Sequence, residues 1–165
     1  MVPQVPENKA MVIYGRKSAP GMKMGYIVLT RGGRSPLPIV ESVEMMDIGP
    51  QKIELDHRDV KVVDGGVDRI AQVMARAVIR VPEDPDVLKV AVEHLLHVSY
   101  RDVGRMAGNI FEAHMRGVLR TTPWEEAKDP MTTAIRVREM MELDLLNIGV
   151  AVEELTIQEL KLRGG

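Results

Sequence analysis

Two histidines one helical turn apart are the residues whose spacing comes nearest to a metal site. His94 and His97 are three positions apart, and Glu93 directly precedes the first of them. A helical zinc hydrolase motif instead places its histidines four positions apart and its glutamate directly after the first. A third ligand would have to come from His57 or His114, and closed zinc sites need three or four ligands. We therefore interpret the pair as packing or surface residues and predict no metal site.

The tripeptide His57-Arg58-Asp59 resembles the start of a protein-kinase catalytic loop. That loop acts only together with a downstream asparagine, a glycine-rich phosphate loop and an Asp-Phe-Gly motif. The sequence contains none of these at the required places. We interpret the tripeptide as a polar loop between strands.

Three further groups of residues could do chemistry, and each has a simpler explanation. Arg31-Gly32-Gly33-Arg34 could bind an anion, but no nucleotide-binding spacing follows, and a tight reversal between strands explains the same glycines. Glu125 and Glu126 could act as general acid and base, but at a helix start they complement the helix dipole. No serine lies in a Gly-x-Ser-x-Gly motif. The sequence therefore predicts no catalytic residues and no cofactor, and we expect the chain not to be an enzyme.

Composition excludes several classes of protein. The absence of cysteine excludes disulfides, thiolate metal sites and thiol catalysis. A net charge of −2 and only five aromatic residues argue against nucleic acid as a partner, because nucleic acid attracts cations and its bases stack on aromatic rings. No apolar run approaches the ~20 residues that span a bilayer. The chain thus has the composition of a globular domain.

The first half of the chain has the pattern of strands separated by turn residues. Apolar runs bounded by glycine, proline and aspartate predict strands over 11–14, 26–30, 39–48, 51–55 and 60–63. Asp64-Gly65-Gly66 predicts a turn. After it, the odd positions from Ala71 to Val81 are all apolar, and this alternation predicts a longer strand.

The second half has helical periodicity. Pro85 suits the first position of a helix that ends near His97, and Ser99 can cap a second helix that reaches Arg120. The apolar residues of the second helix recur at helical spacing, and they are Val103, Met106, Ala107, Ile110, Phe111 and Val118. One face of this helix should therefore be buried.

The segments after residue 121 predict two more helices and a final strand. Thr122-Pro123-Trp124-Glu125 is interpreted as the capping box of a short helix, and Asp129-Pro130 as its end. A last helix should cover 132–147, with Gly149 in the left-handed conformation that ends many helices. A strand over 150–160 can then rejoin the earlier sheet, which gives a mixed α and β domain.

Seven segments, in order along the chain, have the character of known family motifs, and they lie at 6–15, 26–34, 38–43, 63–81, 112–116, 122–126 and 147–157. They include Val63-Asp64-Gly65-Gly66, Glu112-Ala113-His114-Met115-Arg116 and Thr122-Pro123-Trp124-Glu125-Glu126, and it is their order over nearly the whole chain that is specific. In this order the segments resemble the SPFH family of stomatin, prohibitin, flotillin and HflK/C proteins, and most closely the flotillins. Ala113 departs from the glycine that is usual in the family.

The resemblance implies an α+β, SPFH-like domain over residues 1–165. Its β-rich part with a curved, largely antiparallel sheet would cover 1–83, and its mainly helical part with a closing strand would cover 84–161. The family's membrane hairpin and coiled coil are absent from the sequence, so we expect a soluble piece.

The resemblance also implies a function without catalysis. We expect a scaffold at the cytoplasmic face of a membrane, which self-assembles as a homo-oligomer in the full-length protein and organises microdomains, lipids and membrane proteins. The alternative is a monovalent adaptor that binds one membrane protein or membrane protease without forming a ring.

An interface would be expected on the exposed charges of the helix between Ser99 and Arg120. Arg105, Glu112 and Arg116 are the candidate residues, and Glu112 and Arg116 have the i, i+4 spacing of a helical ion pair. An ordinary solvated helix face explains the same residues, since such pairs contribute little to stability. An exposed strand edge is another route to association.

Overall fold

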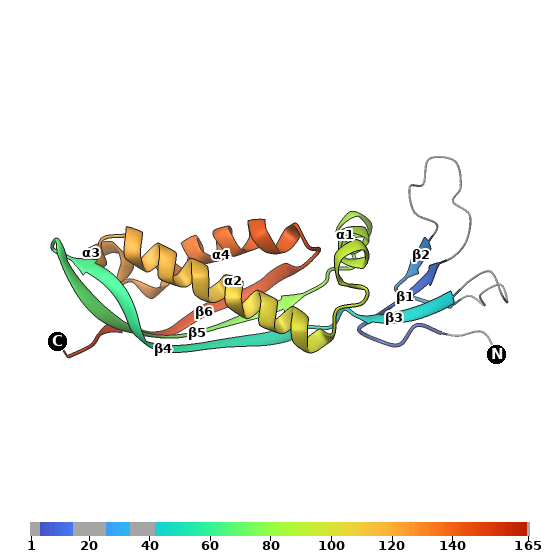
Figure 1. Cartoon of the computed structure of the whole chain (residues 1–165), viewed down its shortest axis with the longest axis horizontal. Helices are drawn as coiled ribbons and strands as arrows, with labels where there is room; N and C mark the ends of the chain where they lie inside the picture. Colours follow the sequence, from blue (N-terminus) through green and yellow to red (C-terminus); the bar gives the residue numbers. More distant parts are fainter. Residues whose placement is uncertain (1–3, 15–25, 34–41, 165) are drawn as a thin grey trace.

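The computed structural model describes residues 4–14, 26–33 and 42–164. Within these residues the chain forms two three-stranded antiparallel sheets and four helices. The molecule is elongated, with the small sheet at one end and the long sheet extending beneath two helices to the other end (Figure 1). The predicted α+β fold with a β-rich first part and a closing strand is confirmed.

The small sheet consists of β1 (Lys9–Tyr14), β2 (Tyr26–Leu29) and β3 (Ser42–Asp47) in the order β2-β1-β3. The strands expected at 11–14 and 26–30 are confirmed, and β3 lies inside the predicted 39–48, of which 39–41 fall outside the described residues.

The prediction that Gly32-Gly33 forms a tight reversal between two paired strands is wrong. β1 separates β2 from β3, so the strands on either side of these glycines do not pair. Instead, the Val5 amide donates a hydrogen bond of 2.7 Å to the Gly32 carbonyl, and Gly33 forms a bridge with Gln4. Arg34 lies outside the described residues.

The long sheet consists of β4 (Gln51–Asp64), β5 (Val67–Arg80) and β6 (Ala151–Leu162). Gly65 and Gly66 have φ of 58° and 81°, and two successive positive φ values are what a tight two-residue hairpin needs. β6 pairs with β5, as expected for a last strand that rejoins the sheet. β4 and β6 therefore form its two edges.

The interpretation of His57-Arg58-Asp59 as a loop is wrong. These residues lie inside β4, which runs unbroken through the two short strands expected at 51–55 and 60–63. Pairing with β5 shifts between His57 and Val60, which is the mark of a β-bulge. The bulge changes the phase of burial, so Ile53 and Leu55 before it and Val60 and Val62 after it all face the core.

The helices are α1 (Pro85–Leu95), α2 (Tyr100–Thr121), α3 (Trp124–Ala127) and α4 (Pro130–Leu146). In Figure 1, α2 and α4 lie side by side on one face of the long sheet, and their contacts place α2 over β4 and α4 over β6. Phe111 of α2 and Met141 of α4 are fully buried in this layer. Met106, predicted to share that buried stripe, is instead 38% exposed.

Two expected helix boundaries are wrong. Pro123, not Thr122, is the N-cap of α3, and no side chain caps it. Thr122 is buried, and its hydroxyl accepts a hydrogen bond of 3.1 Å from Arg136. Asp129-Pro130 begins α4 rather than ending α3. The hydrogen bond from the Thr132 hydroxyl to the Asp129 carboxylate lowers the pKa of Asp129.

Ser99 caps the longest helix, and its removal should weaken the fold. Its hydroxyl oxygen accepts a hydrogen bond of 3.0 Å from the Asp102 amide. Ser99→Ala should lower the free energy of unfolding by ~1 kcal/mol, because a helix amide loses its partner. Urea unfolding followed by circular dichroism would measure the change. Ser99→Asp keeps a capping oxygen and is the matched control, so an equal loss in both variants would contradict the capping role.

Candidate interaction surface

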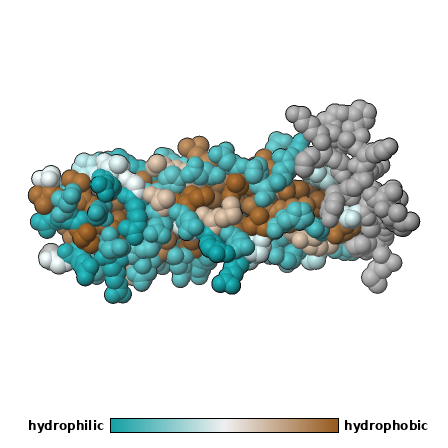
Figure 2. Space-filling view, viewed as in Figure 1, coloured by the Kyte–Doolittle hydropathy of each residue, from teal (hydrophilic) through white to brown (hydrophobic). Residues whose placement is uncertain are grey.

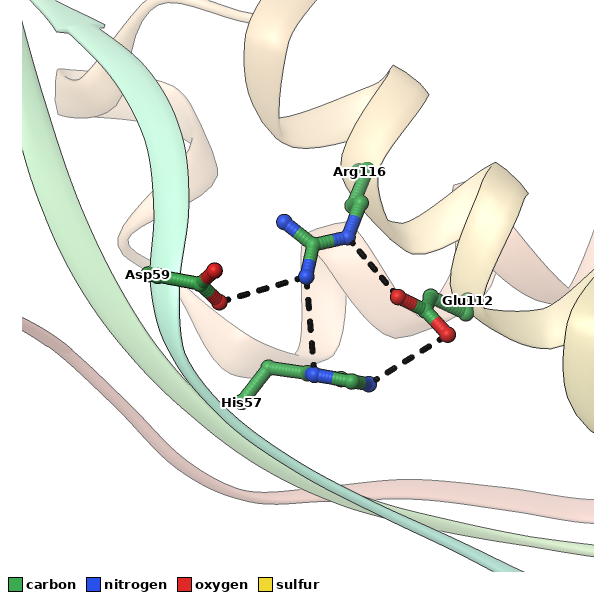
Figure 3. A network of polar contacts seen from close by, with 4 residues as sticks. All are labelled: His57, Asp59, Glu112 and Arg116. Atoms are coloured by element: carbon green, nitrogen blue, oxygen red, sulfur yellow. Dashed lines mark hydrogen bonds and ion pairs between the residues drawn. The ribbon is translucent and has the colours of Figure 1, made fainter.

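Two of the three predicted interface residues lie in one network that joins α2 to β4 (Figure 3). Arg116 Nε donates a hydrogen bond of 3.0 Å to Glu112 Oε1, and Arg116 Nη2 donates one of 3.2 Å to Asp59 Oδ1. Arg116 Nη2 also lies 3.5 Å from His57 Nδ1, and His57 Nε2 lies 3.6 Å from Glu112 Oε2. The network therefore links two helix residues to the two residues that flank the centre of the bulge.

The chemistry of the guanidinium fixes the roles in this network. Arginine can only donate hydrogen bonds, so His57 Nδ1 is the acceptor and Nε2 carries the hydrogen that points to Glu112. Burial acts to lower the pKa of Arg116, but the hydrogen bonds to Glu112 and Asp59 outweigh it and raise that pKa. Because the guanidinium engages both carboxylates, the arrangement is a contact that holds α2 on the bulge.

Arg105, the third predicted residue, lies outside this network. It pairs with Asp102 on its own helix, and its side chain is 70% exposed. The hydrogen bond from Arg105 is the main reason that the pKa of Asp102 is lowered. Sequence spacing had placed Arg105 and Arg116 on one helix, but only Arg116 reaches the sheet.

The pair of Glu112 and Arg116 should contribute measurably to stability. We expect a double-mutant cycle of Arg116→Met and Glu112→Gln to give a coupling of about 0.5 kcal/mol, because both side chains are about one-third exposed. The coupling should fall in ~1 M salt, where the Debye length is about 3 Å. Urea unfolding of the four proteins measures it. The same cycle on Arg105 and Asp102 is the control, and a larger coupling there would contradict the assignment.

The histidines singled out in the sequence have separate partners. His94 Nδ1 lies 2.9 Å from the Val90 carbonyl of its own helix, whereas His97 Nδ1 lies 3.4 Å from Glu44 on β3. His114 Nε2 lies 2.5 Å from Asp144 Oδ2, which links α2 to α4. In the part of the chain that the structure describes, no three His, Asp or Glu side chains are grouped to hold a metal ion.

A cavity of about 170 Å³ lies where the two sheets meet the ends of α1 and α2. Its lining combines aliphatic side chains, such as Val81 and Leu95, with polar ones, such as Asp47 and Gln51. Arg80 also lines it; its Nη1 lies 3.3 Å from the Glu153 carboxylate, whereas its buried Nε has no hydrogen-bond partner among the described residues. The cavity therefore lies at a junction of elements and has a lining of mixed polarity.

The sequence analysis named His57 and Asp59 but interpreted them as part of a loop, so it missed their contact with α2. A signal for this was present in the sequence, because apolar residues fall at odd positions at Ile53 and Leu55 and at even positions at Val60 and Val62. A change of phase inside an alternating segment is what one extra residue in a strand produces. Reading that change would have predicted a bulge, with side chains redirected at its centre.

Similarity to a known protein agrees with the resemblance described above. The chain is 27% identical over 139 residues to Flotillin-1 of Drosophila melanogaster. The chain is flotillin-like in sequence. The aligned region covers 81% of this chain but 32% of the relative, so the chain spans about a third of the flotillin's length. No protein-family model matches the chain.

The flotillin-like chain has no bilayer-crossing helix among its described residues, since none combines sufficient length with sufficient apolar character.

Proposed function

We propose that this flotillin-like chain is a non-enzymatic, membrane-associated scaffold domain that self-assembles and organises membrane microdomains and partner proteins. The observation that carries the proposal is the similarity to Flotillin-1, which extends over 81% of the chain. The proposal treats residues 1–165 as one SPFH-like domain, with a β-rich part over 1–83 and a mainly helical part over 84–161. No cofactor is required for this function.

The arrangement of the described residues is compatible with a binding module. The polar residues around Arg116 join a helix to a strand and so stabilise a surface. The charges of Arg105, Glu112 and Arg116 lie along α2, the helix that covers the edge strand β4. We propose that these charges belong to an interface with a second subunit or a partner protein.

The first test is the mass of the purified chain as a function of concentration, with and without vesicles of phosphatidylcholine and phosphatidylserine. A scaffold domain should associate as its concentration rises, and vesicles should promote this association by concentrating it on a surface. A strictly monomeric chain that ignores vesicles would contradict self-assembly. A monomer that captures one membrane protein at a fixed ratio would instead support the monovalent adaptor.

A further inference from the structure

The solvent-facing side of α4 carries large apolar side chains. Met131, Ile135 and Leu143 are 72%, 53% and 71% exposed, and Leu146 is 43% exposed. Positions spaced by four residues, or by three, lie above one another on a helix. Met131 and Ile135 form one apolar pair and Leu143 and Leu146 another on this side of the helix, with Glu139 between the pairs, and the four apolar residues are here called the α4 stripe.

The opposite side of α4 is already buried, which makes the stripe unusual. Val137, Met141 and Leu145 are fully buried against the sheet and α2. A helix that is apolar on both sides is normally covered on both sides. Figure 2 shows apolar side chains at the surface over the middle of the molecule, where α2 and α4 lie in Figure 1. The stripe therefore has the character of a surface that another molecule covers.

The charges on α4 restrict what can cover it. Arg136 pairs with Glu126, Arg138 with Glu142, and Asp144 with His114. Glu139, which lies within the stripe, is exposed and has no ion pair with any described residue. A partner should therefore bring a cation. An acidic phospholipid surface would repel this carboxylate.

A two-fold pairing of α4 with α4 of a second copy is disfavoured by the same residue. Glu139 lies midway between Ile135 and Leu143 in the sequence. Antiparallel pairing that matched the two apolar ends would place the two Glu139 carboxylates together. Like charges at a contact cost several kcal/mol. The α4 stripe therefore suits a different surface of the neighbouring copy.

The α2 side of the molecule offers a complementary charge at the right height. The link between His114 and Asp144 sets the register of the two antiparallel helices. Because the helices are antiparallel, the residue five positions after His114 on α2 lies level with the residue five positions before Asp144 on α4. These residues are Leu119 and Glu139. The next residue, Arg120, is exposed and has no ion pair with any described residue. A cation and an anion, neither with an ion pair to any other described residue, thus lie at the same height on neighbouring helices.

The sheet places these two helices toward opposite edges. α4 covers the edge strand β6, whereas α2 covers the edge strand β4. Both edge strands are antiparallel to β5 and so run in the same direction. A second copy placed beside the first in the same orientation, displaced only across the strands, would therefore put its α2 side against the α4 side of the first copy.

We propose that a second copy of this chain covers the α4 stripe with its α2 side, and that Glu139 of one copy pairs with Arg120 of the next. This inference rests on the proposed self-assembly and names its surface. Each copy presents one α4 side and one α2 side, so the contact is head-to-tail and repeats. Contacts of this kind build rings or filaments.

Charge reversal tests the pairing. Glu139→Arg and Arg120→Glu should each weaken self-association at least about tenfold, because each creates a like-charge contact. An equimolar mixture of the two variants should associate again, because every contact in an alternating row then joins opposite charges. Lys89→Glu on α1 makes a charge change of the same size elsewhere and should associate like the wild type. Sedimentation velocity across concentration measures all four samples. The proposal would be overturned if either single variant associated as strongly as the wild type, or if the two variants mixed together did not associate.

Cysteine cross-linking gives the geometry directly, since the natural chain has no cysteine. Glu139→Cys mixed with Arg120→Cys should form the mixed disulfide under mild oxidation. Predominant disulfides between two Glu139→Cys chains would show a two-fold contact and overturn the head-to-tail arrangement. Stronger vesicle binding in Glu139→Arg with unchanged self-association would assign the stripe to lipid instead. Wild-type assembly without the mixed disulfide would refute this surface alone, whereas a wild type that never assembles would refute the scaffold function itself.

Discussion

Gly149→Ala should lower the free energy of unfolding by about 2 to 5 kcal/mol, which is a large part of the stability of a domain of this size. Gly149 follows α4 with φ of 84°, a left-handed conformation that disfavours a side chain by ~1–2 kcal/mol. A Cβ atom there would also overlap the backbone nitrogen and Cα of Ala91 on α1. Backbone atoms cannot move aside like the end of a flexible side chain, so α1 or the loop must shift.

Gly65→Ala is the matched control for this prediction. Gly65 also has a positive φ of 58°, but a Cβ there would meet nothing within 4 Å. It should therefore cost only the conformational strain of ~1 kcal/mol. Urea unfolding can be followed through the fluorescence of Trp124, which is the single tryptophan and is buried. Similar losses in the two variants would mean that the close approach of α1 contributes nothing.

Phe111→Ala should cost about 3 to 5 kcal/mol. Phe111 is the single phenylalanine and is fully buried between α2 and the long sheet. Removing the ring loses its favourable burial and leaves a cavity that the surrounding strands can only partly close. The loss should appear as a lower midpoint of urea unfolding with an unchanged slope.

Met106→Ala on the same helix is the control. Met106 is 38% exposed, so its truncation should change the free energy of unfolding by less than about 1 kcal/mol. A loss at Met106 as large as that at Phe111 would mean that α2 is rotated from the orientation described. Sequence periodicity had assigned both residues to one buried stripe, so the comparison also tests whether Met106 lies outside that stripe.

Local patterns accounted for most of the elements. The alternation from Ala71 to Val81 predicted β5, and the two glycines after Asp64 predicted its hairpin with β4. Ser99 was correctly identified as a helix cap and Gly149 as a left-handed terminus. These features depend on the conformational preferences of a few neighbouring residues, so a short window of sequence contains them.

Where a short stretch of sequence allowed two interpretations, contacts with residues far away in the chain decided between them. Thr122 could cap a helix by its residue type, but in the folded chain its hydroxyl accepts a hydrogen bond from Arg136. Asp129-Pro130 could end one helix or begin the next, and the hydrogen bonds from Thr132 make it a beginning. Gly32-Gly33 could form a hairpin, but β1 occupies the place between β2 and β3.

The sequence by itself therefore determined the kinds of element, their order and the flotillin-like character of the chain, because periodicity, caps and turn residues act locally. Only the tertiary structure decided which surface residues meet. It joined His57 and Asp59 of β4 to Arg116 of α2, left Arg105 outside that network, and exposed the apolar stripe of α4. The physical reason is that a side chain's partners depend on strand register, a bulge and helix orientation, which residues far apart in the chain set together.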